Sequence, residues 1–219
     1  MKPLILILFL FFILAAFGQQ PEYPDSGFTN KAEAKNLTVN GKKEGKWVEY
    51  GRNTRGFHGE SDEVATNDIE HADFYYLFVY KDSVPNGLER GYYKNGKLYF
   101  TVFYKNGIRN GVAKQYFEDG ERVEKTFKND TVDGMEISYF SNGKIQSETP
   151  YLMGEQNGIM KTYDSTGRIY KEIPFTKGTE DGMEKEYQEN GKLAAETLYK
   201  DGLILWYKEF DENGTEIKK

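Results

Sequence analysis

Two histidines and a group of carboxylates form the part of this chain best suited to hold a metal ion. His58 and His71 lie in or beside a turn-rich stretch at 51–72, together with Glu60, Asp62, Glu63, Asp68, Glu70 and Asp73. Clustered carboxylates suit a hard cation such as calcium. Their spacing, however, matches neither the HExxH nor the EF-hand pattern. We interpret the stretch as a solvated acidic loop, with weak calcium binding as the alternative, and expect no metal site.

The residues that commonly carry out covalent or hydrolytic catalysis are absent or poorly placed. There is no Cys, which excludes a thiol nucleophile, a thiolate metal site and a disulfide. Both histidines fall in one loop, and no GxSxG motif occurs. Glu148, Glu172 and Glu196 could supply a glycosidase pair, but they recur at a fixed interval, and a repeated residue is more often structural. We expect a protein that is not an enzyme and needs no cofactor.

A column of tyrosines offers a different chemistry, the stacking of aromatic rings on sugars. The column recurs every 23 or 24 residues and comprises Tyr92, Tyr116, Tyr139, Tyr163 and Tyr187. We favour the interpretation that these rings form the half-exposed apolar stripe that a thin sheet requires. Sugar stacking is the alternative.

Two columns of glycine share the period of the tyrosines. One column precedes each Tyr by five residues and comprises Gly87, Gly111, Gly134, Gly158 and Gly182. The other follows each Tyr by four residues and comprises Gly96, Gly120, Gly143, Gly167 and Gly191. A constant period in this range is typical of stacked repeat proteins.

Each repeat has the pattern of a β-hairpin. Turn pairs such as Asn95-Gly96 supply the positive φ of tight turns, and we place the outer turn at Asn106-Gly107 and Asn110-Gly111. The first, third and fifth residues after the first Gly share a face, and we expect the first and the fifth to form a continuous apolar and aromatic stripe on it. The second and fourth should form the wetter face. The predicted fold is all-β: an elongated, single-layer antiparallel sheet of stacked hairpins.

The first 35 residues differ from the repeats. Lys2 precedes an apolar run that ends at Phe17, so residues 1–18 have the pattern of a secretory signal peptide, too short to span a membrane. We expect export to a periplasmic or extracellular location, with no membrane span after the signal is removed. Its removal takes away Lys2 and shifts the net charge from −6 to −7, which disfavours nucleic acid as a partner. The polar residues 19–35 are interpreted as a flexible lead-in.

The remaining chain, 36–219, is predicted to be one repeat domain. Residues 36–51 form a degenerate first repeat, the loop at 51–72 is inserted, and 73–199 hold the regular repeats. At 199–219 the pattern departs from the consensus, since Leu205 stands where Gly is expected. We expect this last segment to be a cap in which Trp206 and Tyr207 cover the open end.

Copies such as the one at 104–111 (YKNGIRNG) and the QENGKL phrase at 188–193 resemble the MORN-repeat variant of bacterial YwqK-like proteins, which are described as antitoxin-like. The resemblance covers 36–51 and 80–219. It implies an elongated sheet built from hairpins and a non-enzymatic binding role. Our leading hypothesis is an exported scaffold that binds a protein partner along its sheet. The alternatives are a module that binds carbohydrate or cell envelope through its aromatic columns, and an antitoxin or immunity-like inhibitor.

Three groups of side chains are candidates for contact with a partner. The first is the column next to the tyrosines, with Tyr93, Phe117 and Phe140. The second lies across the turn and comprises Tyr99 and Tyr170, and the third consists of His58 and His71 in the inserted loop. Which face of the sheet binds is left open.

Overall fold

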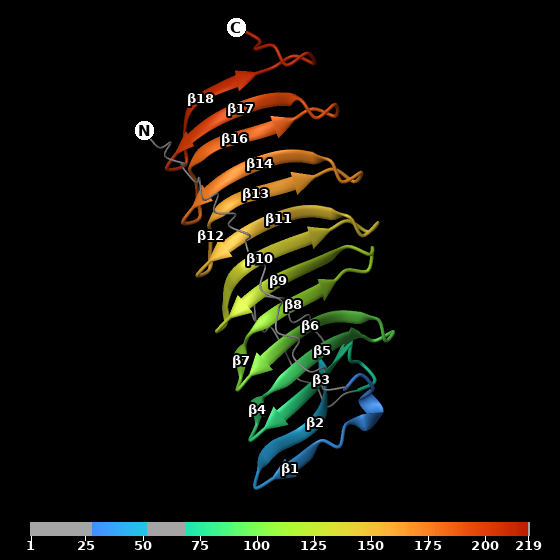
Figure 1. Ribbon diagram of the computed structural model, residues 1–219. Helices are drawn as coiled ribbons and strands as arrows, with labels where there is room; N and C mark the ends of the chain where they lie inside the picture. Colours follow the sequence, from blue (N-terminus) through green and yellow to red (C-terminus); the bar gives the residue numbers. More distant parts are fainter. Residues whose placement is uncertain (1–27, 52–68, 219) are drawn as a thin grey trace, which may run out of the picture.

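The computed structural model describes residues 28–51 and 69–218, which form one open antiparallel sheet (Figure 1). The predicted signal peptide and most of the inserted loop, with His58, lie outside these residues. A short 3-10 helix, η1 (Lys31–Glu33), precedes the strands. The strands are β1 (Leu37–Val39), β2 (Lys42–Gly51), β3 (Phe74–Lys81), β4 (Val84–Pro85), β5 (Gly87–Tyr93), β6 (Leu98–Lys105), β7 (Ile108–Arg109), β8 (Gly111–Tyr116), β9 (Arg122–Lys128), β10 (Thr131–Tyr139), β11 (Ile145–Leu152), β12 (Glu155–Gln156), β13 (Gly158–Tyr163), β14 (Ile169–Thr176), β15 (Thr179–Glu180), β16 (Gly182–Tyr187), β17 (Leu193–Lys200) and β18 (Leu203–Glu209).

The strands pair in the order of the chain. β1 pairs with β2, β2 with β3, and each later long strand with the one before it, up to β17 and β18. The short strands β4, β7, β12 and β15 extend the hairpins at one edge. β1 and β18 therefore lie at opposite ends of an elongated sheet (Figure 1). The prediction of an all-β, single-layer sheet of hairpins is confirmed.

The outer hairpin turns are tight two-residue turns stacked on one another. Asn106 has φ 53° and Gly107 has φ 79°, so both central residues of that turn have positive φ. The Gly107 N–H donates to the carbonyl of Pro85 in the preceding repeat at 2.8 Å. The same bond recurs at Gly154, Gly178 and Gly202, at 2.8–2.9 Å. These bonds set the spacing between repeats along this edge.

The prediction of an outer turn at Asn110-Gly111 is wrong. Asn110 donates its N–H to the carbonyl of Phe103 at 3.0 Å, and Gly111 lies within β8, opposite Phe127. The same Gly–aromatic pairing joins Gly87 to Tyr104, Gly134 to Tyr151, Gly158 to Phe175 and Gly182 to Tyr199. These five glycines lie where the strand pairing is irregular, and each has a positive φ that other residues rarely adopt. Space is limited as well, since a Cβ on Gly158 would lie 2.9 Å from Cγ of Pro150.

The opposite turns follow the prediction. In the turn at 93–97, Gly96 has φ 82° and its N–H donates to the Tyr93 carbonyl at 2.8 Å. The Asn95 side chain accepts a hydrogen bond from the Lys97 N–H at 2.9 Å, which fixes the turn locally. Equivalent bonds recur at Gly120, Gly143, Gly167 and Gly191.

The sheet has two faces that differ in burial. We call face A the side that carries Glu89, Phe100 and Val102, and face B the side that carries Arg90 and the tyrosine column. Because side chains alternate along a strand, the first, third and fifth positions do share face B, as predicted. The prediction that the second position lies on the wetter face is wrong: Glu89 is 2% exposed and Glu184 is 4% exposed on face A, whereas Ile159 on face B is 52% exposed.

Face A holds the aromatic core toward the N-terminal end. Its buried members are Tyr76, Phe78, Tyr80, Tyr99, Phe100, Val102, Ala113 and Phe127, with Trp47, Phe74, Tyr93, Tyr104 and Val132 packed against them. Gly91 lies directly under the Phe100 ring, and a Cβ there would lie 2.4 Å from Cε1 of that ring. This cluster explains how a sheet of one layer can have buried side chains.

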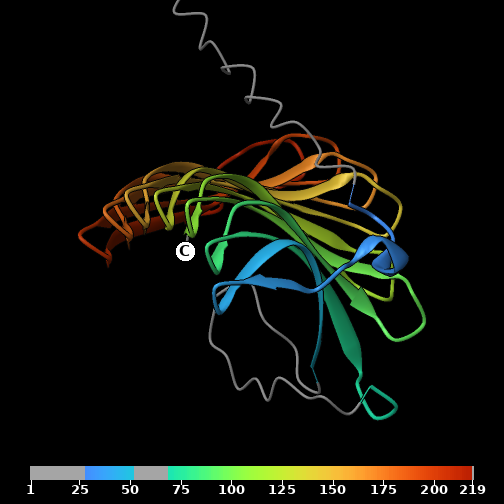
Figure 2. The ribbon, with the colours of Figure 1, turned by 90° about the horizontal axis from the view of Figure 1, so that it is seen from below.

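Residues 28–35 of the predicted lead-in are packed on the sheet. Phe28 is fully buried, and its carbonyl accepts a hydrogen bond from Nη1 of Arg90 at 2.8 Å. The Lys46 ammonium lies 5.3 Å from the Phe28 ring centroid, and the Lys31 ammonium lies 5.0 Å from that of Tyr75. Figure 2 shows η1 beside the N-terminal end of the curved sheet. The buried phenyl ring gives this segment the apolar contact that its polar composition did not suggest.

The C-terminal cap does not form in the predicted way. β18 is an edge strand, and Leu203, Ile204, Leu205 and Tyr207 are 70%, 61%, 59% and 52% exposed. Trp206 is half-buried, and Phe210 forms a single bridge with Glu216. Trp206 and Tyr207 are themselves part of the last strand and therefore cannot cover its outer edge.

Candidate functional site

Face B of strands β10–β17 carries a row of apolar side chains, which we call the apolar row. It comprises Met135, Pro150, Ile159, Pro174, Met183 and Leu198. Met135 lies opposite Pro150, Ile159 opposite Pro174, and Met183 opposite Leu198. Most of these side chains are half-buried, and Ile159 is exposed. The repeat therefore places an apolar pair at the same height in each successive hairpin.

A second row on face B consists of tyrosines and glutamates joined between repeats, which we call the Tyr–Glu row. The Tyr163 hydroxyl donates to Oε2 of Glu148 at 2.7 Å, and the Tyr187 hydroxyl donates to Oε2 of Glu172 at 2.9 Å. Burial, together with the hydrogen bond to Glu148, raises the pKa of Tyr163 to about 12. Burial and the bond to Glu172 raise the pKa of Tyr187 as well. Glu148 and Glu172 thus each link one hairpin to the next.

Charged groups on face B are paired beside the tyrosines. Nζ of Lys161 lies 4.0 Å from Oε1 of Glu172, and Nζ of Lys114 lies 3.2 Å from Oε1 of Glu124. The Arg122 guanidinium lies 3.8 Å from the ring centroid of Tyr139. Since these groups already have partners within the sheet, a ligand covering them would bury few unpaired charges.

Face A of the C-terminal repeats contains ion pairs in the place of the aromatic core. Nζ of Lys171 lies 2.8 Å from Glu184 and 2.9 Å from Glu186, and Lys125 lies 3.0 Å from Glu136. Burial acts to lower the pKa of Lys171, but the two carboxylates outweigh it and raise the pKa. These pairs satisfy charges that the sheet has partly removed from water, so removing one partner would leave the other charge partly buried and unpaired.

Two of the predicted contact residues belong to the core. Tyr93 and Tyr99 have ring centroids 4.9 Å apart, and both rings pack against Phe74. Tyr99 is 5% exposed, and burial raises the pKa of Tyr93. The structure therefore brings these two residues together in the aromatic core, where Tyr99 has almost no surface to offer a partner.

The other aromatic candidates are separate from this cluster. Phe117 is 40% exposed, Tyr170 is 54% exposed and Phe140 is half-buried. Within the described part of the chain no ring contact joins Phe117, Phe140 or Tyr170 to another aromatic residue. They are three isolated rings rather than one aromatic surface.

The loop candidates are only partly described. His71 is exposed at the end of the inserted stretch, near the start of β3, whereas His58 lies outside the described residues. In 28–51 and 69–218 there is no group of three or more His, Asp or Glu placed to hold a metal ion. The same residues contain no helix long and apolar enough to cross a membrane.

The sequence pattern predicted Met135, Ile159 and Met183 as part of an apolar stripe, but it did not indicate the paired row on face B as a binding surface. The signal that could have found it is Pro150 and Pro174, which recur at one column and face Met135 and Ile159. Proline cannot donate to a ladder and presents its ring to the neighbouring strand. A sequence pattern shows which side chains share a face of the sheet. It does not show which of the two half-buried faces is less exposed to solvent.

Comparison with known families agrees with the repeat geometry. Residues 85–106, 132–152, 156–177 and 180–201 each match the family described as MORN repeat variant. Each of these segments begins just after an outer hairpin turn, and they cover most of β4–β6 and β10–β17 but not β7, β8 and β9. The comparison with curated proteins found no match.

Proposed function

From the four matches to the MORN repeat variant, we propose that this chain is a non-enzymatic scaffold that binds a protein partner along face B of β10–β17. The observation that supports it is the apolar row, half-buried apart from the exposed Ile159, which runs beside the Tyr–Glu row. No described element lies over this part of face B, whereas residues 28–35 cover the same face near β3 and β5. A surface of this kind is left for another molecule.

The chemistry of the row fits a protein partner. Apolar side chains at the centre with polar groups beside them match the usual arrangement of a protein interface. Met135 and Met183 add flexible side chains that adapt to the shape of the opposing surface. The net charge of −6 favours a partner with a basic rim around its apolar centre.

The proposal includes export. Residues 1–18 have the pattern of a secretory signal, so the partner belongs to the periplasm or the extracellular space. An inhibitor of an exported toxin is one form that such a scaffold takes, and the antitoxin-like description of similar proteins supports that form.

Affinity capture from an envelope fraction tests the proposal. The full chain is compared with a double variant, Ile159→Glu and Met183→Glu, which places two carboxylates in the apolar row. We expect the captured protein to fall by at least about tenfold, because two charges would be buried in the interface. The control variant is Leu37→Glu, since Leu37 is 50% exposed and lies in β1, outside β10–β17. Equal capture by the double variant would exclude the apolar row as the binding surface.

The second candidate function is recognition of an envelope polysaccharide. It is favoured by the exposed rings of Tyr170 and Phe117, which could stack on sugars. Sedimentation with purified peptidoglycan separates the two functions. Loss of binding in Tyr170→Ala, with retention in the Ile159→Glu and Met183→Glu variant, would favour the polysaccharide.

A further inference from the structure

The first outer turn, Asn40-Gly41, differs from the later ones in one backbone hydrogen bond. In each later turn the second central residue donates its N–H to a carbonyl of the turn before, at 2.8–3.0 Å. The donors and acceptors are Ser83 and Lys43, Gly107 and Pro85, Asp130 and Arg109, Gly154 and Val132, Gly178 and Gln156, and Gly202 and Glu180. Asn40-Gly41 joins β1 to β2 at the end of the sheet, where no described turn precedes it (Figure 1). The Gly41 N–H therefore has no acceptor within 28–51 and 69–218.

The turn at Asn106-Gly107 is a matched reference for the first turn. Both turns have the dipeptide Asn-Gly, and their φ values are close: 51° and 53° for the asparagines, 76° and 79° for the glycines. They differ in the glycine N–H, which is bonded to the Pro85 carbonyl in one turn and has no described acceptor in the other. Asn40 and Gly41 are both exposed, and a Cβ on Gly41 would meet no atom within 4 Å. Water therefore reaches both residues of the first turn.

Most other Asn-Gly pairs are held by hydrogen bonds of their own. In the turns at 95–96, 142–143 and 190–191, the glycine N–H donates to the carbonyl three residues earlier. In the same turns the asparagine side chain accepts a hydrogen bond from the N–H two residues later. At 86–87, 110–111 and 157–158 the glycine lies in a paired strand. In these pairs the glycine nitrogen is therefore less free to react than that of Gly41.

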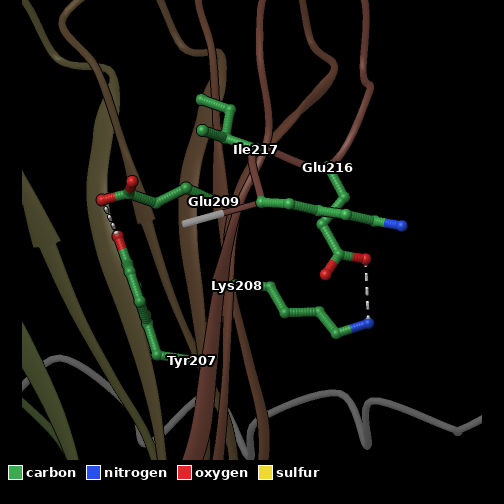
Figure 3. Close-up of a pocket in the computed structure, with 6 residues that line it drawn as sticks. Tyr207, Lys208, Glu209, Glu216 and Ile217 are labelled. Carbon is green, nitrogen blue, oxygen red and sulfur yellow. Dashed lines mark hydrogen bonds and ion pairs between the residues drawn. The ribbon is translucent and has the colours of Figure 1, made fainter.

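The C-terminal end of the array also has an exposed Asn-Gly pair, but hydrogen bonds hold it. The turn Asn213-Gly214 leads to Glu216, which with Lys208 lines the shallow hollow of about 400 Å³ in Figure 3. The Gly214 N–H donates to the Asp211 carbonyl at 2.9 Å, and Oδ1 of Asp211 accepts from the Asn213 N–H at 2.9 Å. Among the Asn-Gly pairs of the described ranges, the first therefore stands apart, since neither the Gly41 N–H nor the Asn40 side chain has a partner there.

We propose that Asn40 is a site of spontaneous modification, at which its side-chain amide is replaced by a carboxylate. The backbone nitrogen of Gly41 attacks Cγ of Asn40 and forms a cyclic imide, while the bond from Cγ to Nδ2 breaks. The side-chain nitrogen leaves as ammonia, with the proton that the Gly41 N–H gives up. Water then opens the imide at either carbonyl, which gives aspartate or isoaspartate. The reactants are the chain and water, and nothing is oxidised or reduced.

The hydrogen bond between turns accounts for the difference in reactivity. A glycine N–H that donates to a carbonyl must lose that bond before its nitrogen can attack the asparagine. We expect Asn40 to lose its amide at least about threefold faster than Asn106 in the folded chain, which corresponds to the net contribution of one hydrogen bond. Isoaspartate adds a carbon to the backbone of the two-residue turn. It should weaken the β1–β2 hairpin, in which β1 has three register pairs.

Peptide mapping by mass spectrometry tests the proposal on the purified full chain, incubated in mildly alkaline buffer. The exchange of ammonia for water at each Asn-Gly pair is followed with time. The matched control is Lys177→Asn, which places the same dipeptide at Gly178, an exposed glycine whose N–H donates to the Gln156 carbonyl at 2.8 Å. A Cβ on Gly178 meets no atom within 4 Å, as at Gly41, so the two glycines are equally open and differ in the hydrogen bond. We expect position 177 of this variant to react as slowly as Asn106.

Incubation in concentrated urea separates the effect of the fold from that of the local sequence. In the unfolded chain no turn bond protects either glycine, so the rates at Asn40 and Asn106 should agree within about twofold. A faster rate at Asn40 that disappears in urea, together with a slow rate in Lys177→Asn, supports the proposal. Equal rates at Asn40 and Asn106 in the folded chain overturn it. A difference that persists in urea, or a rate in Lys177→Asn that equals the rate at Asn40, also overturns it.

Discussion

The N-terminal and C-terminal halves of the sheet use the same hairpin but fill face A differently. In β2–β6 the interior is aromatic: Tyr76 and Phe100 have ring centroids 5.9 Å apart, and Phe78 and Tyr80 are 5.2 Å apart. In β9–β17 the equivalent surface is bridged by Lys125 to Glu136 and by Lys171 to Glu184. Beyond Tyr104, the described residues contain no ring pair.

The difference shows that the backbone of the hairpin does not determine which side chains cover face A. Turn residues and the Gly–aromatic pairing define the backbone of every repeat, whereas the second position after the Gly is Glu89, Ala113, Glu136, Met160 or Glu184. The N-terminal half is in addition covered on face B by residues 28–35. We expect it to be the more stable half, with stability based on apolar burial rather than on charge.

The largest test of this comparison is Tyr76→Ala. Tyr76 is fully buried in the aromatic core, so its loss should cost about 3–5 kcal/mol of unfolding free energy. Phe175→Ala removes a half-buried ring from the same face of the C-terminal half and should cost less than half as much. Urea unfolding followed by tyrosine fluorescence measures both. Equal losses would mean that the two halves are not stabilised differently.

The next test separates the interior of the array from its end. Tyr139→Ala removes a ring that lies 3.8 Å from the Arg122 guanidinium in β9 and should cost about 2 kcal/mol. Phe210→Ala, beyond β18, should cost about 1 kcal/mol, because only one neighbouring hairpin packs on it. Equal urea midpoints for the two variants would count against stability that is summed over neighbours.

A smaller effect is expected from removing one cation on face A. Lys171→Met leaves Glu184, whose side chain is 6% exposed, without its closest partner, and should cost about 1–2 kcal/mol. The loss should shrink in about 1 M salt, because screening weakens the wild-type pairs. Thermal unfolding at low and high salt measures this. A loss that does not depend on salt would argue that Lys171 acts by packing alone.

The smallest effect concerns the Tyr–Glu row. Tyr163→Phe removes the hydrogen bond to Glu148 and should cost about 1 kcal/mol at neutral pH. The pKa of Tyr163 is raised from 10.0 to about 12 in the folded state, so the unfolded chain loses this proton first as the pH rises. The stability it contributes is present below pH 10 and is lost between pH 10 and about 12. Wild type should therefore lose more stability than Tyr163→Phe across this window in alkaline urea titrations.

The period of the sequence predicted the backbone because turn chemistry is local. Asn95-Gly96 and Asn106-Gly107 form the turns that their residues favour. Asn110-Gly111 contains the same dipeptide but lies at the start of β8, where Gly111 faces Phe127 across the strands. The Asn-Gly dipeptide therefore predicted a positive φ at Gly111 correctly, but it did not show whether the chain reverses direction at that residue.

The burial of the faces could not be predicted from alternation alone. Glu184 is 4% exposed because Lys171 neutralises it and Thr197 lies opposite, contacts that bring together three strands. Phe28 is buried through Arg90, more than 60 residues away in the chain. Both results depend on contacts across the sheet, which a reading of single repeats does not contain.

The stacked outer turns have a mechanical consequence. Backbone hydrogen bonds of 2.8–3.0 Å join each outer turn to the previous one, and successive hairpins are joined by strand pairs such as β6–β8, β11–β13 and β14–β16. Tension applied between the two ends should therefore peel the chain off hairpin by hairpin, giving a sawtooth of similar force peaks rather than one rupture. The extension that such a molecule reaches under tension should therefore increase in proportion to the number of its hairpins.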